Sequence, residues 1–382
     1  MKKRRLEKVL AIIAVLTLIV AGLLGFRKEA GEVKNNVASI LPASCYSEKS
    51  DEMQFKVFDK ESDILVGYIS IEQSNGYGGK MDVAILVDTS AHITDIEVIK
   101  HRETPSFLKK VEKKGLIKSL IGKKHSDSFS DGEDIVIVSG ATYTSDALIN
   151  SSRKGVRKIA SNEMNLPVPD DEPVHFSIDI PEIALILLYV IAFFGIYSGF
   201  KYKNQLRWIT MTGGLIILGF WFAVPLSLAK INSFLLGFWP SWHTELYWYI
   251  LIFGFVITLI ATGKNIYCTW ICPVGCIQES LGVIGAAKPR FSKKINNVMK
   301  WISRTIAWLA IAMALYFRNP VKINYEIFGV STSLTGATYL FAMTGIFFIA
   351  SLFIKRPWCR YLCPITPISD FLQLFKPKKN SK

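Results

Sequence analysis

Six long apolar segments constrain the fold of this 382-residue chain more than any other feature. An α-helix needs about 20 predominantly apolar residues to cross the hydrocarbon core of a bilayer. Many segment ends carry Trp or Tyr, which favour the membrane–water interface. None of the segments holds a charged residue or His near its middle, which argues against a proton relay, an ion pathway or a transporter of charged substrates. The six segments are residues 9–26, 183–200, 208–228, 248–261, 301–317 and 339–354.

The distribution of Lys and Arg predicts how these segments are oriented. Hydrophobic residues make up 50% of the chain and the formal net charge is +14, which favours a membrane protein with basic loops over a nucleic-acid binder. With the N-terminus in the cytoplasm, the loops rich in Lys and Arg also face the cytoplasm, as the positive-inside rule requires. We therefore expect a multi-pass protein of the cell membrane with six transmembrane helices, both termini in the cytoplasm and residues 27–181 outside.

The segment between the first two apolar runs has the pattern of a folded α+β domain. We expect the first run to be a retained anchor rather than a cleaved signal peptide, because no Ala-x-Ala site follows it closely. The external domain is predicted to contain β-rich runs at residues 63–72, 81–88, 93–100 and 135–138, and helices at 107–120 and 147–160. The predicted organisation is an anchor at residues 1–26, the external domain at 45–165, a linker at 166–181 and an all-α membrane domain of five helices at 182–382.

Ser139-Gly140-Ala141-Thr142 stands where the predicted strand at 135–138 turns into a helix. Small residues at such a turn let backbone N–H groups approach an anion, and a helix N-terminus favours a phosphate. The plainer interpretation is a turn followed by a helix N-cap, where Ser and Thr are favoured anyway.

This motif resembles the FMN-attachment motif of the flavin-binding domain shared by sodium-pumping quinone reductase, Rnf complexes and NosR/NirI proteins. Gly76-Tyr77-Gly78-Gly79 and Glu103-Thr104-Pro105 resemble two upstream elements of the same domain. In that family a flavin transferase links FMN to the last Thr of the motif through a phosphoester, and the resemblance implies this role for Thr142. The flavin-site residues that the resemblance implies are Thr142, Ser139, Gly140, Ala141, Thr144, Ser145, Tyr77, Gly78, Glu103 and Thr104.

Two copies of Cys-x-x-x-Cys-Pro, at residues 268–273 and 359–364, follow apolar segments on the predicted cytoplasmic side. Four-residue spacing would put both thiols of a pair on one helical face, and the Pro would mark a bend or the end of that turn. Two such pairs brought together would present four thiolates, the number that a 4Fe-4S cluster requires. The nearby basic residues Lys264, Lys355, Arg356 and Arg360 would favour thiolate over thiol.

Other chemistries remain open for these cysteines. The motif resembles the end of a bacterial ferredoxin run but lacks its Cys-x-x-Cys spacing, and a redox-active dithiol or tetrahedral zinc would use the same residues. Cys276 is a fifth thiol and a substitute ligand, whereas Cys45 is expected to be unpaired and non-functional. The candidate metal ligands are Cys268, Cys272, Cys276, Cys359 and Cys363.

Over nearly its whole length the chain resembles the NosR/NirI family of membrane flavoproteins, including the C components of reductive dehalogenase clusters. The resemblance implies an electron-transfer component of anaerobic respiration rather than a stand-alone catalyst, and no catalytic residue is predicted. Electrons would enter from menaquinol or a cytoplasmic donor, pass the Cys sites, and leave through FMN to an extracytoplasmic reductase. The alternative is a redox-sensing regulatory protein or a reductase-maturation factor. The expected partners are membrane lipid, menaquinone, that reductase and the flavin transferase, with no nucleic acid.

The predicted topology leaves one difficulty. The hydrocarbon core is about 30 Å thick, and it would separate FMN outside from the thiols inside. The five His residues lie outside the apolar segments, so no bis-His haem fills the gap. Either the flavin domain folds down toward the membrane, or a quinone carries the electrons between FMN and the thiols, or electrons do not cross the membrane through this protein.

Overall fold

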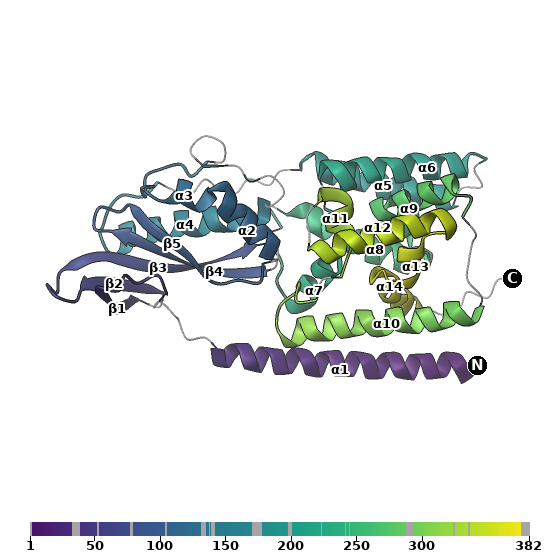
Figure 1. Ribbon diagram of the computed structural model, residues 1–382, viewed down its shortest axis with the longest axis horizontal. Helices are drawn as coiled ribbons and strands as arrows, with labels where there is room; N and C mark the ends of the chain where they lie inside the picture. The colour runs from purple at the N-terminus through teal and green to yellow at the C-terminus, as the bar shows by residue number, and fades with distance from the viewer. Residues whose placement is uncertain are drawn as a thin grey trace. The chain divides into compact units, whose positions relative to one another are not determined.

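The computed structural model divides the chain into two compact units. The sheet unit is Arg27–Pro173, and the helical unit combines Met1–Phe26 with Val174–Lys382. Figure 1 shows the elements of both units. The residues that the structure describes are 2–32, 39–51, 53–76, 79–103, 105–130, 135–136, 138, 142–169, 178–197, 201–222, 224–240, 242–243, 245–287, 293–323, 325–334 and 337–375.

The sheet unit contains five antiparallel strands in sequence order, a meander in which each strand pairs with the next. In β4, Met81, Val83, Ile85 and Val87 are all fully buried, because alternate residues of a strand point to the same face. The helix α4 packs on this face, and its residues Leu148, Val156 and Ile159 belong to the same core. The strands are β1 (Cys45–Asp51), β2 (Gln54–Asp59), β3 (Leu65–Gly76), β4 (Gly79–Asp88) and β5 (Ile93–Lys100), and the helix α4 is Thr142–Asn162.

One prediction for the sheet unit is wrong. The single helix predicted at 107–120 is two helices, α2 (Pro105–Lys114) and α3 (Leu116–Leu120), because Gly115 adopts the left-handed conformation with φ of 82°. The strand predicted at 135–138 lies partly outside the described residues. Its described residue Ile135 forms a single β-bridge, and Ile135 and Val138 are buried in the core.

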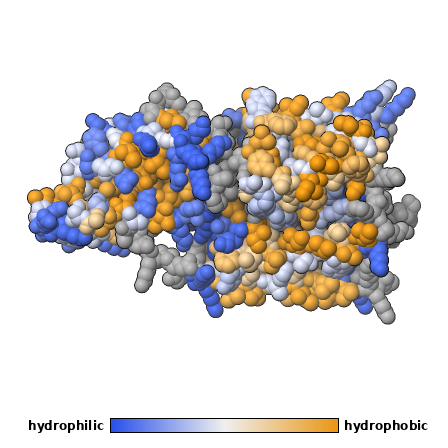
Figure 2. Space-filling model, in the orientation of Figure 1, coloured by the Kyte–Doolittle hydropathy of each residue, from blue (hydrophilic) through white to orange (hydrophobic). Residues whose placement is uncertain are grey.

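The helical unit is apolar on much of its outer surface, as Figure 2 shows. Two stretches of helix are long and apolar enough to cross a membrane, Arg5–Lys28 and Lys294–Tyr316. Three further apolar stretches of helix are shorter, so the six transmembrane helices remain a prediction. They are Ile180–Ile196, Leu246–Thr262 and Thr338–Phe353. The long helices of the unit are α1 (Lys2–Glu32), α5 (Ile180–Tyr197), α6 (Lys203–Gly214), α8 (Leu246–Thr262), α9 (Pro273–Ile284), α10 (Lys293–Tyr316) and α12 (Thr338–Phe353). The shorter helices are α7 (Leu228–Leu236), α11 (Phe328–Ser333), α13 (Pro357–Tyr361) and α14 (Ile365–Leu374).

The apolar segment predicted to span at 208–228 is not one α-helix. The helix α6 continues into a π-helix, η2 (Leu215–Trp221), and α7 starts only at Leu228 after its N-cap Ser227. Gly214 lies at the junction, where an added Cβ would stand 2.1 Å from the carbonyl oxygen of Ile271. Without a side chain here, this helix can approach the segment that carries the first Cys motif.

Candidate functional site

Three stretches that the sequence analysis assigned to one flavin site meet in the sheet unit. The β3–β4 hairpin closes with Gly76 paired to Gly79, and an added Cβ on Gly76 would stand 2.2 Å from Oε1 of Glu103. The hydroxyl of Thr144 donates a hydrogen bond to Oε2 of the same carboxylate at 2.7 Å. The buried Glu103 therefore connects the end of the hairpin to the first turn of α4.

The start of α4 has one feature that favours an anion and one that opposes it. Thr142 is the first residue of the helix, and the first turn carries no acidic residue of its own, so the positive end of the helix dipole favours an anion there. The carboxylate of Glu103 already contacts this turn through Thr144. Thr144 and Ser145 are both buried. The predicted site residues Ser139, Gly140, Ala141, Tyr77, Gly78 and Thr104 lie outside the described residues.

The two Cys motifs fold alike, although not as one continuous α-helical face. Cys268 lies in a π-helix, η3 (Tyr267–Ile271), while Cys272 leaves the helical conformation and Pro273 opens α9. The second motif repeats this design, with Cys359 in α13 and Pro364 at the N-cap of α14. In each motif the second Cys N–H donates to the carbonyl five residues back at 2.9 Å, from Cys272 to Tyr267 and from Cys363 to Trp358.

The first and second Cys of both motifs form one group of four thiols. Each has electrostatic interactions with others of the set, and Cys363 interacts with all three of the rest. Cys272 and Cys363 are buried, and the remaining two, Cys268 and Cys359, are half-buried. The helical unit thus brings together four sulfurs from motifs about 90 residues apart in sequence.

The nearby basic residues Arg356 and Arg360 favour the thiolates, as expected, but burial outweighs them in this group. Burial raises the pKa of all four thiols, that of Cys272 to about 12. Arg356 acts in the opposite direction on Cys272, but its attraction is smaller than the desolvation cost. A bound metal centre would reverse this balance, because coordination to a cation deprotonates a thiol outright.

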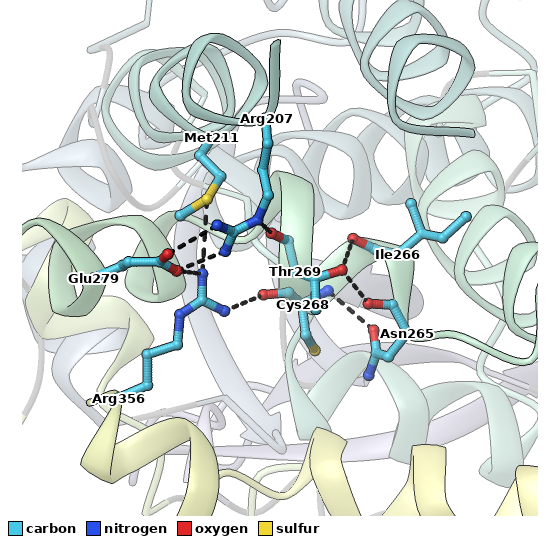
Figure 3. A network of polar contacts seen from close by, with 8 residues as sticks. All are labelled: Arg207, Met211, Asn265, Ile266, Cys268, Thr269, Glu279 and Arg356. Atoms are coloured by element: carbon cyan, nitrogen blue, oxygen red, sulfur yellow. Dashed lines mark hydrogen bonds and ion pairs between the residues drawn. The ribbon is translucent and has the colours of Figure 1, made fainter. Parts of the chain in front are cut away.

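A polar network holds the thiol-bearing segments together (Figure 3). Arg207 donates to both carboxylate oxygens of Glu279, at 2.8 and 2.6 Å. Arg356 forms an ion pair with the same carboxylate and donates to the carbonyl oxygen of Cys268 at 2.9 Å. Burial raises the pKa of the Glu279 carboxyl, but the guanidinium groups of Arg207 and Arg356 outweigh this effect and hold the pKa below its usual value. The three side chains leave one net positive charge beside the thiols, which suits an anionic cluster.

The four thiols supply the number of ligands that an iron–sulfur cluster requires, and tetrahedral zinc would use the same number. Among the described residues, no group of three or more His, Cys, Asp or Glu side chains is arranged to hold a metal ion. Cys276 is directed elsewhere: its thiol has side-chain hydrogen bonds with Ser280 and Thr212. Cys45 lies in β1 of the sheet unit.

Glu279 and Arg207 belong to this site although no local motif marks them. Glu279 and its neighbour Gln278 are polar residues in a mostly apolar helix. Such polar residues in an apolar helix are a usable signal for buried polar contacts. The partners of Glu279 could not be found from sequence, because Arg207 and Arg356 each lie more than 70 residues away.

The thiol-bearing segments are also contacted by residues predicted to lie toward the opposite side of the membrane. Leu226, at the outer end of the predicted span 208–228, donates its backbone N–H to the hydroxyl of Tyr267 at 2.8 Å. Tyr325, in a loop predicted to lie outside, has its ring centroid 6.3 Å from that of Trp358. Tyr267 and Trp358 immediately precede Cys268 and Cys359, so these residues are not a full bilayer thickness away from the thiol-bearing segments.

Two domain families match the chain. A family described as an FMN-binding domain matches residues 76–157, which include Glu103 and Thr142. A family described as a 4Fe-4S binding domain matches in two pieces, residues 244–294 and 336–382. Each of these pieces contains one Cys-x-x-x-Cys-Pro motif.

Curated relatives share parts of the chain. YccM of Escherichia coli (strain K12), whose name assigns it to electron transport, is 27% identical over 160 residues, covering 38% of this chain and 44% of YccM. NirI of Paracoccus denitrificans (strain Pd 1222) is 26% identical over 210 residues, covering 49% of this chain and 30% of NirI. The regulatory protein NosR of Pseudomonas aeruginosa is 22% identical over 205 residues, covering 50% of this chain and 29% of NosR. The chain spans less than half the length of each of these relatives.

Proposed function

We propose that this chain, a NosR/NirI-type flavoprotein by its FMN-binding domain, its 4Fe-4S binding domain and its likeness to NirI and NosR, transfers electrons between a cluster held by its two Cys motifs and FMN attached at Thr142. The observation that carries the proposal is the group of four thiols, drawn from both motifs, beside a net positive network. The cofactors supply the one- and two-electron chemistry, and the protein supplies binding, orientation and electrostatics.

The residues of the sheet unit have distinct roles in this proposal. The hydroxyl of Thr142 is the attachment point for FMN through a phosphoester made by a flavin transferase, and the N-terminus of α4 stabilises the phosphate. Glu103 holds the first turn of α4 against the hairpin through Thr144. Ser139, Gly140 and Ala141 form the turn that the phosphate approaches.

In the helical unit, Cys268, Cys272, Cys359 and Cys363 are the four ligands, with Cys276 left outside the set. Arg356 and Arg207 supply positive charge that stabilises an anionic cluster. Glu279 positions both guanidiniums.

The proposed route runs through the membrane. We place both termini and the Cys motifs on the cytoplasmic side of six transmembrane helices, and the FMN domain outside. Electrons come from quinol or a cytoplasmic donor and go to an extracytoplasmic reductase. The contact between Leu226 and Tyr267 supports this route, because it shortens the distance that the outer side must bridge.

Two chemical analyses of the purified full chain test the cofactor assignment. We expect FMN that stays bound after denaturation, iron and labile sulfide. Thr142→Ala should abolish the denaturation-resistant FMN, whereas Thr89→Ala, which changes an exposed Thr of the same unit, should keep it. Cys363→Ser should lose most of the iron, whereas Cys45→Ser should keep it. Resistant flavin in Thr142→Ala would refute the attachment site, and metal-free protein with full electron transfer would refute the cluster.

A redox-sensing regulatory role is the second candidate, favoured by the regulatory protein NosR among the relatives. Vesicles that contain the full chain separate the two functions. Oxidation of reduced FMN upon addition of quinone supports electron transfer, whereas no response favours sensing or reductase assembly.

A further inference from the structure

Gln278 connects the two halves of the thiol site. It is fully buried on α9, and its Oε1 accepts a hydrogen bond from the backbone N–H of Trp358 at 3.1 Å. Trp358 immediately precedes Cys359. The side chain therefore joins the helix that follows the first Cys motif to the backbone of the second.

The amide nitrogen of Gln278 has no hydrogen-bond partner among the described residues, although it is buried. Buried N–H groups are nearly always paired, and leaving one unpaired costs about 1–3 kcal/mol. Exchanging the amide oxygen and nitrogen would not resolve this, because the Trp358 N–H needs an acceptor and only the oxygen can accept. The orientation of the amide is thus set by its partner.

The unpaired nitrogen lies near the backbone that leads into the second Cys motif. The two heteroatoms of an amide are about 2.3 Å apart, so Nε2 lies within about 5.5 Å of the Trp358 nitrogen. Gly275 lies one turn before Gln278 on the same face of α9, and its surroundings indicate which groups that face contacts. An added Cβ on Gly275 would stand 3.6 Å from Cβ of Cys272 and 3.5 Å from a guanidinium nitrogen of Arg356.

We propose that Gln278 donates its side-chain N–H to a sulfur of the cluster and thereby raises the reduction potential of the cluster. This inference rests on the proposed function, since it needs the cluster. Hydrogen bonds to cluster sulfurs are among the factors that set the potential. A donor stabilises the reduced form, which carries one more negative charge.

Redox titration of the purified holoprotein, followed by electron paramagnetic resonance, tests the proposal. Gln278→Glu keeps an oxygen for the Trp358 N–H but replaces the donor by a carboxylate. We expect at least about a tenfold lower ratio of reduced to oxidised cluster at a fixed applied potential, a shift of about 59 mV to more negative values for one electron. Gln278→Met, which removes the donor without adding charge, should shift the midpoint in the same direction by less. Gln373→Glu, on α14, adds the same charge where the amide donates to Ser369 and should leave the midpoint unchanged.

Vibrational spectroscopy of the cluster provides a second readout. In deuterated water the iron–sulfur modes of the parent protein should shift, and those of Gln278→Met should shift less. This inference would be overturned if both Gln278 variants had the reduction midpoint of the parent protein and if Gln278→Met kept the parental deuterium shift. That outcome would leave the proposed function standing. Parent protein without iron and labile sulfide would overturn the proposed function itself.

Discussion

The two units place their apolar side chains in opposite ways. In the sheet unit the apolar residues of β4 face inward and are fully buried. In the helical unit many large apolar side chains face outward, such as Phe194, Ile257 and Ile346, each more than 60% exposed. Apolar burial can specify the packing of a domain in water, whereas it discriminates little between helices surrounded by lipid. In the helical unit the thiol-bearing segments share an inner apolar core that includes Tyr267 and Trp358, and the partly buried polar contacts of Glu279 add specific links between them.

The largest expected effect tests this contrast with one substitution made in each unit. Ile85→Ala should destabilise the sheet unit by about 2–5 kcal/mol, because it opens a cavity in a well-packed core. Ile257→Ala, at a side chain that is 62% exposed, should change stability by about 0.5 kcal/mol or less. Hydrogen exchange of the detergent-solubilised full chain measures both. Equal losses of stability in Ile85→Ala and Ile257→Ala would contradict the difference in apolar burial between the two units.

The second prediction concerns the polar contacts of the helical unit. Glu279→Gln should cost about 2 kcal/mol, because it leaves two partly buried guanidiniums without their carboxylate. The effect should appear as a lower midpoint of thermal unfolding and as lost iron. Asp370→Asn is the matched control: it breaks an ion pair with Arg304 that is about one-third exposed, and such pairs contribute about 0–1 kcal/mol. A similar loss in both variants would show that burial of the pair has no special role.

The third prediction is a dependence of stability on pH. Glu326 lies outside the predicted spans, and burial raises its pKa to about 8, although the N–H groups of Leu228 and Ala229 act against this. Between its ordinary value near 4.5 and about 8, the folded state keeps a proton that the unfolded state loses. Stability should therefore fall as the pH rises through this window, by about 1.4 kcal/mol per unit from this group.

Thermal unfolding of Glu326→Gln between pH 5 and pH 8 checks this dependence. The variant resembles the protonated acid, so its unfolding midpoint should fall less steeply with pH than that of the parent. Glu48→Gln changes an exposed carboxyl of β1 and should retain the parental slope. A Glu326→Gln slope equal to that of the parent would assign the pH dependence to other groups.

The sequence predicted β3, β4, β5 and α4 of the sheet unit, because their signals are local. β3, β4 and β5 follow from apolar runs of residues, and α4 follows from the turn before Thr142. The strands β1 and β2 were not predicted, because Cys45–Asp51 is mostly polar and Gln54–Asp59 is only six residues long. The break at Gly115 was missed because one Gly inside a helical pattern is ambiguous until its φ is known.

For the helical unit, the sequence predicted the apolar segments and the grouping of the two Cys motifs. It could not predict the division of residues 208–228, since apolar composition does not distinguish a π-helix followed by a turn from one long helix. The network of Arg207, Glu279 and Arg356 joins residues far apart in sequence. The site residues that came from local motifs were thus accessible, whereas those that hold the motifs together were not.

The proposed cluster would need insulation from water. Tyr267, Trp270 and Trp358, each 3% exposed or less, place large rings around the thiol-bearing turns. Packed aromatic side chains of this kind exclude water and ions from the sulfurs. A cluster bound here would therefore exchange electrons through packed protein atoms rather than through solvent.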